Sequence, residues 1–124
     1  MAVVFEKTKM LTDTVFHYCP GCNHGIAHRL VAESIEELGL EDNVIGVAPV
    51  GCAVFAYDYF NCDMFEAAHG HAPAAATGIK RVHPATCVFT HPGDGDPAPT
   101  GTNELVNPSH PGPNITAILI NNPI

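Results

Sequence analysis

The sequence predicts an α/β fold built on a parallel sheet, and three observations support this prediction. Short apolar runs alternate with helical stretches along the 124 residues, a pattern typical of βαβ units. Three segments rich in glycine, acidic or amide residues follow directly on apolar runs. The composition, with 46% hydrophobic and 15% charged residues, is that of a folded, core-rich chain. We therefore expect a single domain, residues 1–124, whose ligands bind beyond the carboxyl ends of the strands.

The first part of the chain predicts an extended segment, a tight turn and a helix. Residues 1–18 lack a regular pattern, and Cys19–Cys22 (CPGC) contains the residues of a turn. Asn23 can then cap a helix that runs to about Leu38, where a glycine follows as a natural stop. The helix is predicted because apolar residues recur near a 3.6-residue period. They are Ile26, Ala27, Leu30, Val31, Ile35 and Leu38.

The rest of the chain predicts three strands and two further helical stretches. Apolar runs predict buried strands, and the many small residues after Gly70 predict a helix that packs close to the sheet. In chain order we expect a strand at 44–48, a short helix at 54–60, a helix within 70–82, and strands at 86–90 and 115–120. Residues 91–113 are rich in proline, which disfavours helix interiors, so at most residues 100–107 can be helical there.

Polar segments at the ends of the predicted strands indicate a site for a diphosphate and a divalent cation. Gly93-Asp94-Gly95-Asp96 follows one strand, and glycines there let the backbone approach a diphosphate without a Cβ clash. The Asp94 carboxylate, the Asn122 amide oxygen and the Ile124 carbonyl are oxygen donors of the kind that Mg²⁺ prefers. The alternative interpretation is an ordinary turn followed by a strand-end cap. Two such segments, one crossover apart, favour the cofactor site.

The cysteines indicate metal binding or redox chemistry. Cys19 and Cys22 form a CxxC motif, and Cys52 follows a predicted strand end, so the three thiolates can meet at one iron–sulfur cluster. Cys62 and Cys87 are candidates for a fourth ligand. Zinc bound by Cys19, Cys22, His24 and His28 is an alternative, although the loop between the pairs is short for a zinc finger. A thioredoxin-like redox motif is a third interpretation.

Charge and hydropathy exclude several function classes. The formal net charge of −8 disfavours nucleic acid, because phosphate backbones are bound by clustered cations. No apolar run approaches the roughly 20 residues of a membrane span, and residues 1–9 do not resemble a signal peptide, so we expect a cytoplasmic protein. Six histidines show no metal-ligand spacing, and most are expected to be surface or hydrogen-bonded residues: His17, His69, His71, His83, His91 and His110. His69-Gly70 opens the small-residue helix, whose N-terminus could face an anion.

At these motifs the sequence resembles the β subunit of 2-oxoacid:ferredoxin oxidoreductases, with the 2-oxoisovalerate and 2-oxoglutarate types nearest. The resemblance rests on four segments in the same order and spacing: LTDTVFHYCPGCNHGIAHR, GVAPVGCAVFAYDYF, AHGHAPAAATGIKR and the GDGD–NN pair. It implies a three-layer α/β/α parallel-sheet fold that binds thiamine diphosphate, of which residues 1–124 form the N-terminal portion. The family usually has glycine where Asn23 stands and arginine where His71 stands.

The resemblance also implies a set of cofactors, ligands and partners. Cys19, Cys22 and Cys52 match the ligands of a [4Fe–4S] cluster, Asp94 and Asn122 match the magnesium ligands, and the carbonyl of Ile124 falls at the third position. The family's fourth cysteine lies beyond Asn122, which predicts that a complete subunit continues past Ile124. The implied cofactor-binding residues are Gly51, Cys52, His69, Gly70, Gly93, Asp94, Gly95, Asp96 and Asn122.

The implied reaction is the oxidative decarboxylation of a 2-oxoacid with coenzyme A. The implied partners are ferredoxin, an α subunit and, in larger assemblies, γ and δ subunits. A degenerate, inactive remnant of the same fold and a non-catalytic zinc-binding module remain the alternatives.

Overall fold

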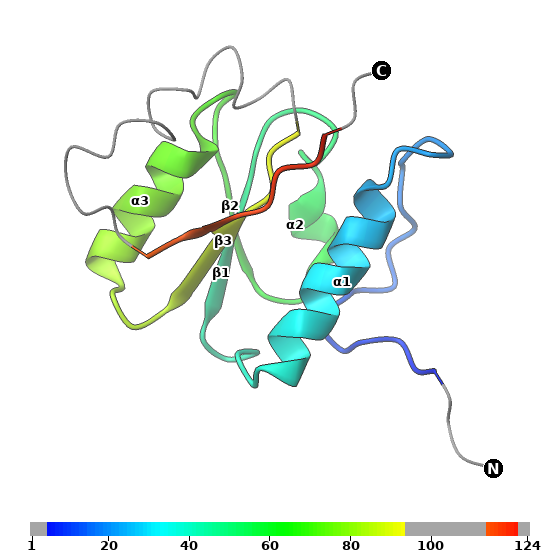
Figure 1. Cartoon of the computed structure of the whole chain (residues 1–124), viewed down its shortest axis with the longest axis horizontal. Helices are drawn as coiled ribbons and strands as arrows, with labels where there is room; N and C mark the ends of the chain where they lie inside the picture. The colour runs from blue at the N-terminus through cyan, green and yellow to red at the C-terminus, as the bar shows by residue number, and fades with distance from the viewer. Residues whose placement is uncertain (1–4, 94–113, 122–124) are drawn as a thin grey trace.

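The computed structural model describes residues 5–93 and 114–121, and Figure 1 shows how their helices and strands are arranged. The strands are β1 (Val44–Ala48), β2 (Asp63–Glu66), β3 (Cys87–Thr90) and β4 (Thr116–Ala117). The helices are α1 (His24–Glu37), α2 (Ala56–Tyr59) and α3 (Ala72–Val82). All strand pairs are parallel, as the alternation of apolar runs and helices predicted. The carboxyl ends of the strands therefore share one edge of the sheet.

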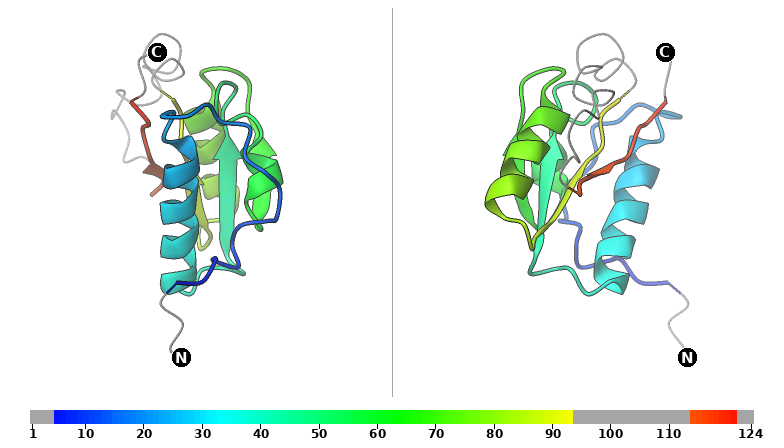
Figure 2. Two further views of the ribbon diagram at one scale, coloured as in Figure 1. Left: turned by 90° about the vertical axis from the view of Figure 1, so that its right-hand side faces the viewer. Right: turned by 60° about the vertical axis from the view of Figure 1, so that its left-hand side comes forward.

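The helices cover both faces of this sheet, which gives the three layers that the family resemblance implied. Figure 2 shows α1 and α3 on opposite sides of the strands. One core cluster joins Ala32 and Ile35 of α1 to Ala56 of α2 and to the face of the sheet that α1 covers. The other joins the buried Ala72 and Ala76 of α3 to the opposite face. The small side chains of α3 thus pack directly on the sheet, as expected from residues 70–82.

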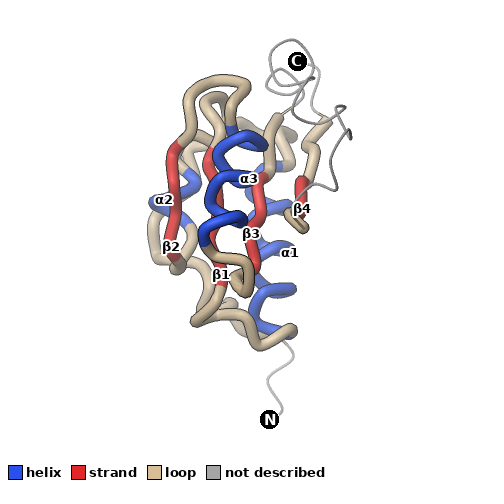
Figure 3. The backbone as a smooth tube through the Cα atoms, turned by 90° about the vertical axis from the view of Figure 1, so that its left-hand side faces the viewer, coloured by secondary structure: helices blue, strands red, loops and turns tan. Residues whose placement is uncertain are grey.

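The strand order is β2-β1-β3-β4, so β1 is central and β2 and β4 are the outer strands (Figure 3). The limits of β1 match the sequence prediction, and β3 differs by one residue. β4 is shorter than the predicted 115–120, although Ile118 still donates a backbone hydrogen bond to Thr90. β2 was not predicted, because its exposed sequence DMFE shows no apolar run. It forms a strand because its backbone pairs with β1 along four residues.

Helix α1 forms where the sequence predicted, but the face that it buries is different. The buried residues are His24, His28, Ala32 and Ile35. Three of the apolar residues whose spacing predicted the helix, Ile26, Leu30 and Leu38, are more than half exposed, at 63%, 57% and 70%. The apolar period therefore identified the helix correctly, whereas the buried residues in its N-terminal part are two histidines, His24 and His28. Among the described residues, no helix has the length and apolar character needed to cross a membrane.

The start of α1 explains one departure from the family pattern. Asn23 has a φ of 65°, in the left-handed region that glycine adopts without strain, and asparagine is among the residues that tolerate it. The glycine usual at this position in the family is therefore replaced by a residue compatible with the same backbone. Asn23 occupies the N-cap position, as predicted, but its side chain makes no capping hydrogen bond.

Candidate functional site

Three loops converge at the carboxyl edge of the sheet, at the top of Figure 1. Ala67, after β2, donates a backbone hydrogen bond of 2.9 Å to Ala48 at the end of β1. The ring nitrogen Nδ1 of His69 lies 3.1 Å from the carbonyl oxygen of Val50. Beyond β3 and β4, Gly93 and Ile120 form a parallel bridge. The structure therefore places the strand-end segments on one edge, where parallel α/β sheets bind ligands.

A second group of residues reaches this edge from the turn before α1. Cys22 is buried at the turn, and His24 is the first residue of the helix. Their side chains, together with that of Cys52 after β1, offer donor atoms that all lie within 4.8 Å of one another. The Sγ of Cys22 and the Nδ1 of His24 are 3.1 Å apart. Two segments separated by a helix and a strand thus bring two sulfurs and one imidazole together.

The three predicted cluster ligands are not equivalent in this structure. Cys22 and Cys52 belong to the close group, whereas Cys19 is exposed and is not part of it. Cys19 is tied to the same turn, because its carbonyl accepts a hydrogen bond of 3.1 Å from the Cys22 amide. Sequence spacing identified Cys22 and Cys52 but assigned His24 only to the zinc alternative.

The zinc alternative also paired His28 with the CxxC motif, but His28 has a different partner. Its Nε2 forms a hydrogen bond of 2.5 Å with the Tyr18 hydroxyl. The donor set that the structure assembles is therefore Cys22, His24 and Cys52. Sulfur and imidazole donors suit iron or zinc and not Mg²⁺.

A buried cluster of aromatic and histidine rings packs beside His24 at this edge of the sheet. His28 and His91 are completely buried and meet edge to face, with ring centroids 4.6 Å apart. Tyr59 contacts His28 and bonds through its hydroxyl to the Nδ1 of His17 at 2.5 Å. Most of the six histidines without metal-ligand spacing were expected to be surface or hydrogen-bonded residues. His91 is an exception, because it is buried and neither of its ring nitrogens has a hydrogen-bond partner among the described residues. No pattern in the sequence distinguished it.

Burial makes these groups resist ionisation. Loss of hydration lowers the pKa of His28 to about 3, and the neighbouring His91, His24 and His17 add to the effect. Burial, followed by the charge of His24, lowers the pKa of His91 to about 4. Burial raises the pKa of Tyr18, with Tyr59, Cys22 and Cys52 contributing further. These three side chains are therefore neutral at physiological pH.

Several of the predicted site residues lie outside the described residues. These are Asp94, Gly95 and Asp96 of the GDGD motif, together with Asn122 and Ile124. The structure describes the chain up to Gly93 and from residue 114 to Asn121. The bridge between Gly93 and Ile120 brings together the strand ends that precede both motifs. The magnesium ligands therefore stay a prediction, and so does the phosphate-facing role of His69.

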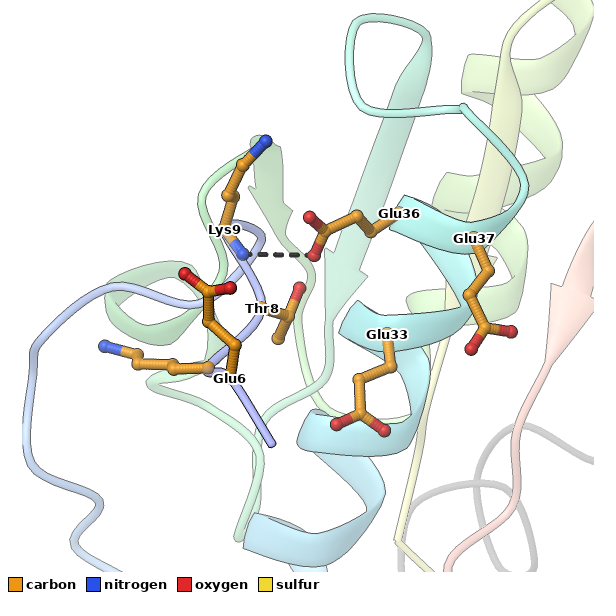
Figure 4. A pocket seen from close by; sticks show the side chains of 7 residues that line it. Glu6, Thr8, Lys9, Glu33, Glu36 and Glu37 are labelled. Atoms are coloured by element: carbon orange, nitrogen blue, oxygen red, sulfur yellow. Dashed lines mark hydrogen bonds between the residues drawn. The ribbon is translucent and has the colours of Figure 1, made fainter. Parts of the chain in front are cut away.

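The acidic cavity in Figure 4 is distinct from this site. It has a volume of about 420 Å³ and lies between residues 6–9 and the C-terminal half of α1. Glutamates dominate its lining, and Glu36 accepts a hydrogen bond of 3.1 Å from the backbone amide of Lys9. None of the cysteines or histidines of the sheet edge lines it.

Comparison with known proteins agrees with the motifs. Residues 49–124 match the family model of the thiamine pyrophosphate enzyme, C-terminal TPP binding domain. The chain is 44% identical over 121 residues to the ketoisovalerate oxidoreductase subunit VorA of Methanothermobacter marburgensis, covering 98% of this chain and 25% of that protein. It is 35% identical over 108 residues to the 2-oxoglutarate synthase subunit KorB of Methanothermobacter thermautotrophicus, covering 86% and 38%.

A solved structure shows the same fold. The 2-oxoglutarate:ferredoxin oxidoreductase from Magnetococcus marinus, with 2-oxoglutarate, coenzyme A and succinyl-CoA bound, superposes with a TM-score of 0.81 at 25% identity. The match covers 94% of this chain and 42% of that chain. The chain thus spans from 25% to 42% of the length of these three relatives. The resemblance inferred from the sequence motifs is confirmed, and the chain belongs to the family of thiamine pyrophosphate enzymes, with residues 49–124 in its C-terminal TPP-binding domain.

Proposed function

We propose that this chain is the thiamine-diphosphate-binding part of the β subunit of a 2-oxoacid:ferredoxin oxidoreductase. Such an enzyme converts a 2-oxoacid and coenzyme A into an acyl-CoA and CO₂, while electrons pass singly to ferredoxin. The observation that carries the proposal is the convergence of Cys22 and Cys52 at the carboxyl edge of a parallel sheet, on the side where β3 ends and the chain continues to Gly93. The similarity to oxidoreductase subunits supports the same conclusion.

In this proposal the cysteines and the GDGD–NN pair have separate roles. Cys19, Cys22 and Cys52 hold a [4Fe–4S] cluster that takes up electrons. Asp94, Asn122 and the Ile124 carbonyl hold Mg²⁺, while Gly93 and Gly95 leave room for the diphosphate. Thiamine diphosphate, when bound, supplies the carbon nucleophile that the reaction needs, and the protein positions it. Ferredoxin and an α subunit are the proposed partners, in a cytoplasmic assembly.

The cluster is tested by anaerobic reconstitution of the full chain with ferrous iron, sulfide and a thiol. We expect iron and acid-labile sulfide to bind in equal amounts, and Cys22→Ala and Cys52→Ala to lose them. Cys62→Ala is the matched control, because Cys62 precedes β2 at the opposite edge of the sheet and contacts Met64. A chain that binds one zinc and no iron would contradict the proposal and support the zinc-binding module.

The cofactor site is tested separately by calorimetric titration with thiamine diphosphate and Mg²⁺. We expect binding that depends on both components and is lost in Asp94→Ala while the circular dichroism of the chain is unchanged. A carboxylate that holds the metal contributes more to binding than one that only closes a turn. Unchanged affinity in Asp94→Ala, or no binding by the parent chain, would favour the inactive remnant instead.

A further inference from the structure

His24 lies against the Cys22 thiol with a geometry that suits a hydrogen bond. Its Nδ1 is 3.1 Å from the Sγ of Cys22, and the residue is only 1% exposed. Cys52 completes the group, with all three donor atoms within 4.8 Å of one another. A buried ring at this distance from a sulfur is shielded from competing water, so the interaction is stronger than it would be at the surface.

The ring of His24 is held in place on its other sides. It stacks on Tyr18, with centroids 5.2 Å apart and an interplanar angle of 23°. The edge that carries Nε2 faces the end of β3, where a Cβ built on Gly93 would lie 4.0 Å away. His24 therefore occupies the space between the Cys22 sulfur and the last described residue before the GDGD motif. Stacking on Tyr18 and the approach of Nε2 to Gly93 therefore support its orientation toward Cys22.

Metal binding would determine whether the Cys22 sulfur or the His24 ring nitrogen donates the hydrogen bond between them. A cysteine that ligates a metal is a thiolate and has no proton to give. The short contact between Sγ and Nδ1 then requires the proton to be on the imidazole, so Nδ1–H donates to the sulfur. Hydrogen bonds to ligating sulfurs are one of the features by which proteins adjust the reduction potential of an iron–sulfur cluster. They stabilise the reduced cluster more, because it carries the greater negative charge.

We propose that His24 is a positioning residue that donates a hydrogen bond from Nδ1 to the Cys22 thiolate and so makes the metal centre easier to reduce. This inference rests on the proposed function, because it requires Cys22 and Cys52 to hold an iron–sulfur cluster. It assigns His24 a role beside the cluster and not in its coordination.

Two substitutions at His24 separate the donor from the rest of the ring. His24→Asn keeps an N–H group near the position of Nδ1, whereas His24→Gln places its amide nearer to Nε2. Both keep a polar side chain in the buried site, so they perturb folding to a similar degree. His28→Gln is the control, because His28 is one helical turn further on, is equally buried, and contacts Tyr18 through Nε2.

The experiment uses the full chain, reconstituted anaerobically as above, with iron and sulfide analysis and a dye-mediated redox titration followed by electron paramagnetic resonance. We expect every variant to bind as much iron and sulfide as the parent. In His24→Gln the potential becomes more negative, and the ratio of reduced to oxidised centre at a fixed potential falls by about tenfold. We expect His24→Asn and His28→Gln to keep the parent's potential.

Four outcomes would overturn the inference. An unchanged potential in His24→Gln would show that the contact does not affect the centre. Loss of iron from His24→Gln would make His24 a ligand. An equal shift in His24→Asn, or in His28→Gln, would indicate a general change of packing. A parent chain without iron and sulfide would refute the proposed cluster itself, and this inference with it, so the two failures are distinguishable.

Discussion

At the scale of single residues, Gly46 shows how closely neighbouring strands pack in this sheet. It lies in the central strand β1, and a Cβ built there would overlap the Sδ of Met64 on β2 and lie 2.8 Å from the Cζ of Phe89 on β3. Phe89 is buried, so its ring has little room to move. The glycine is therefore required by the contact between side chains from both neighbouring strands.

Gly46→Ala should lower the free energy of unfolding by about 1–3 kcal/mol, because the added methyl group overpacks the core. Gly78→Ala is the control, since Gly78 is an exposed residue of α3 and a Cβ built there meets no described atom within 4 Å apart from its chain neighbours and its own helix backbone. That substitution should raise the free energy by about 0.5–1 kcal/mol, as is usual inside helices. Urea denaturation measures both. Equal effects of the two substitutions would contradict the close contact.

The burial of His28 and His91 predicts that the folded chain loses stability in mild acid. Burial keeps both rings neutral, with the pKa of His28 at about 3 and that of His91 at about 4, against 6.5 as the ordinary value. Below pH 6.5 the unfolded chain takes up protons that the folded chain refuses, so unfolding becomes easier as the pH falls. Tyr18 and His24 contact the His28 ring, and His17 acts on it electrostatically; none of the three is an acidic group that would compensate.

We therefore expect the free energy of unfolding to be highest above about pH 6.5. It should decrease toward about pH 4, with a slope of up to about 1.4 kcal/mol per pH unit for each of the two histidines. Urea titrations at several pH values measure this slope. His91→Gln should reduce it, and the exposed His83→Gln should leave it as in the parent. A slope that is unchanged in His91→Gln would refute the assignment.

At the scale of elements, α1 carries an unfavourable charge at its C-terminal end. Its last turn has no basic residue, and Glu37 lies there one turn after Glu33. The negative end of the helix dipole and the like charge four residues earlier both disfavour a carboxylate at this position. Glu36 is different, because its carboxylate accepts a hydrogen bond from the Lys9 amide and bonding to residues 8 and 9 lowers its pKa (Figure 4).

Glu37→Lys should therefore raise the free energy of unfolding by about 0.3–1 kcal/mol at low salt. Glu37→Gln should give about half of that gain, because it removes the repulsion without adding an attraction. Thermal denaturation followed by circular dichroism compares the three proteins. If lysine and glutamine have the same effect, the helix dipole is not responsible.

The elements also differ in how well the sequence predicts them. β1, α1 and α3 appear where period and composition placed them, because their own residues carry the apolar pattern. The limits of β2 and β4 are not indicated by an apolar pattern in their own residues. The exposed residues of β2 form a strand only through backbone pairing with β1. β4 pairs through two residues, and most of the apolar run at 115–120 continues outside regular structure.

At the scale of the whole molecule, the net charge of −8 makes electrostatic repulsion a general property of the folded chain. In the part that the structure describes, two ion pairs form, Lys7–Asp13 and Arg29–Glu33, and both lie on partly or fully exposed side chains. Surface pairs contribute little. Repulsion among the thirteen acidic residues, against five basic ones, should therefore determine how the chain responds to salt.

Raising NaCl from roughly 0.01 M to roughly 0.15 M should increase the melting temperature by a few degrees, since the screening length falls from about 30 Å to about 8 Å. Differential scanning calorimetry measures the shift, and potassium chloride serves as a control for ion-specific effects. Glu37→Lys changes the net charge from −8 to −6, so its response should be smaller. A melting temperature that falls with salt would show that attractive pairs dominate.

The candidate site was predictable where it depends on strand ends and not where it depends on packing. Cys52 and Gly93 follow apolar runs, so their place at one edge of the sheet could be inferred from the sequence. The approach of His24 to Cys22 and Cys52 could not be inferred from the sequence, because it requires α1 to begin close to the segments that follow β1 and β3. The exposed Ile26 and the buried His24 show why, since hydrophobicity alone does not indicate which of these two positions packs inside the molecule.

The sequence by itself determined the parallel α/β architecture, the extent of β1 and α3, and the family, because these depend on local period and on motifs that neighbouring residues carry. The tertiary structure alone decided which face of α1 is buried, that β2 is a strand, and that His24 and His91 lie inside the molecule. These features arise from contacts between segments distant in sequence. The energy of such contacts depends on the surroundings of each side chain as well as on its type.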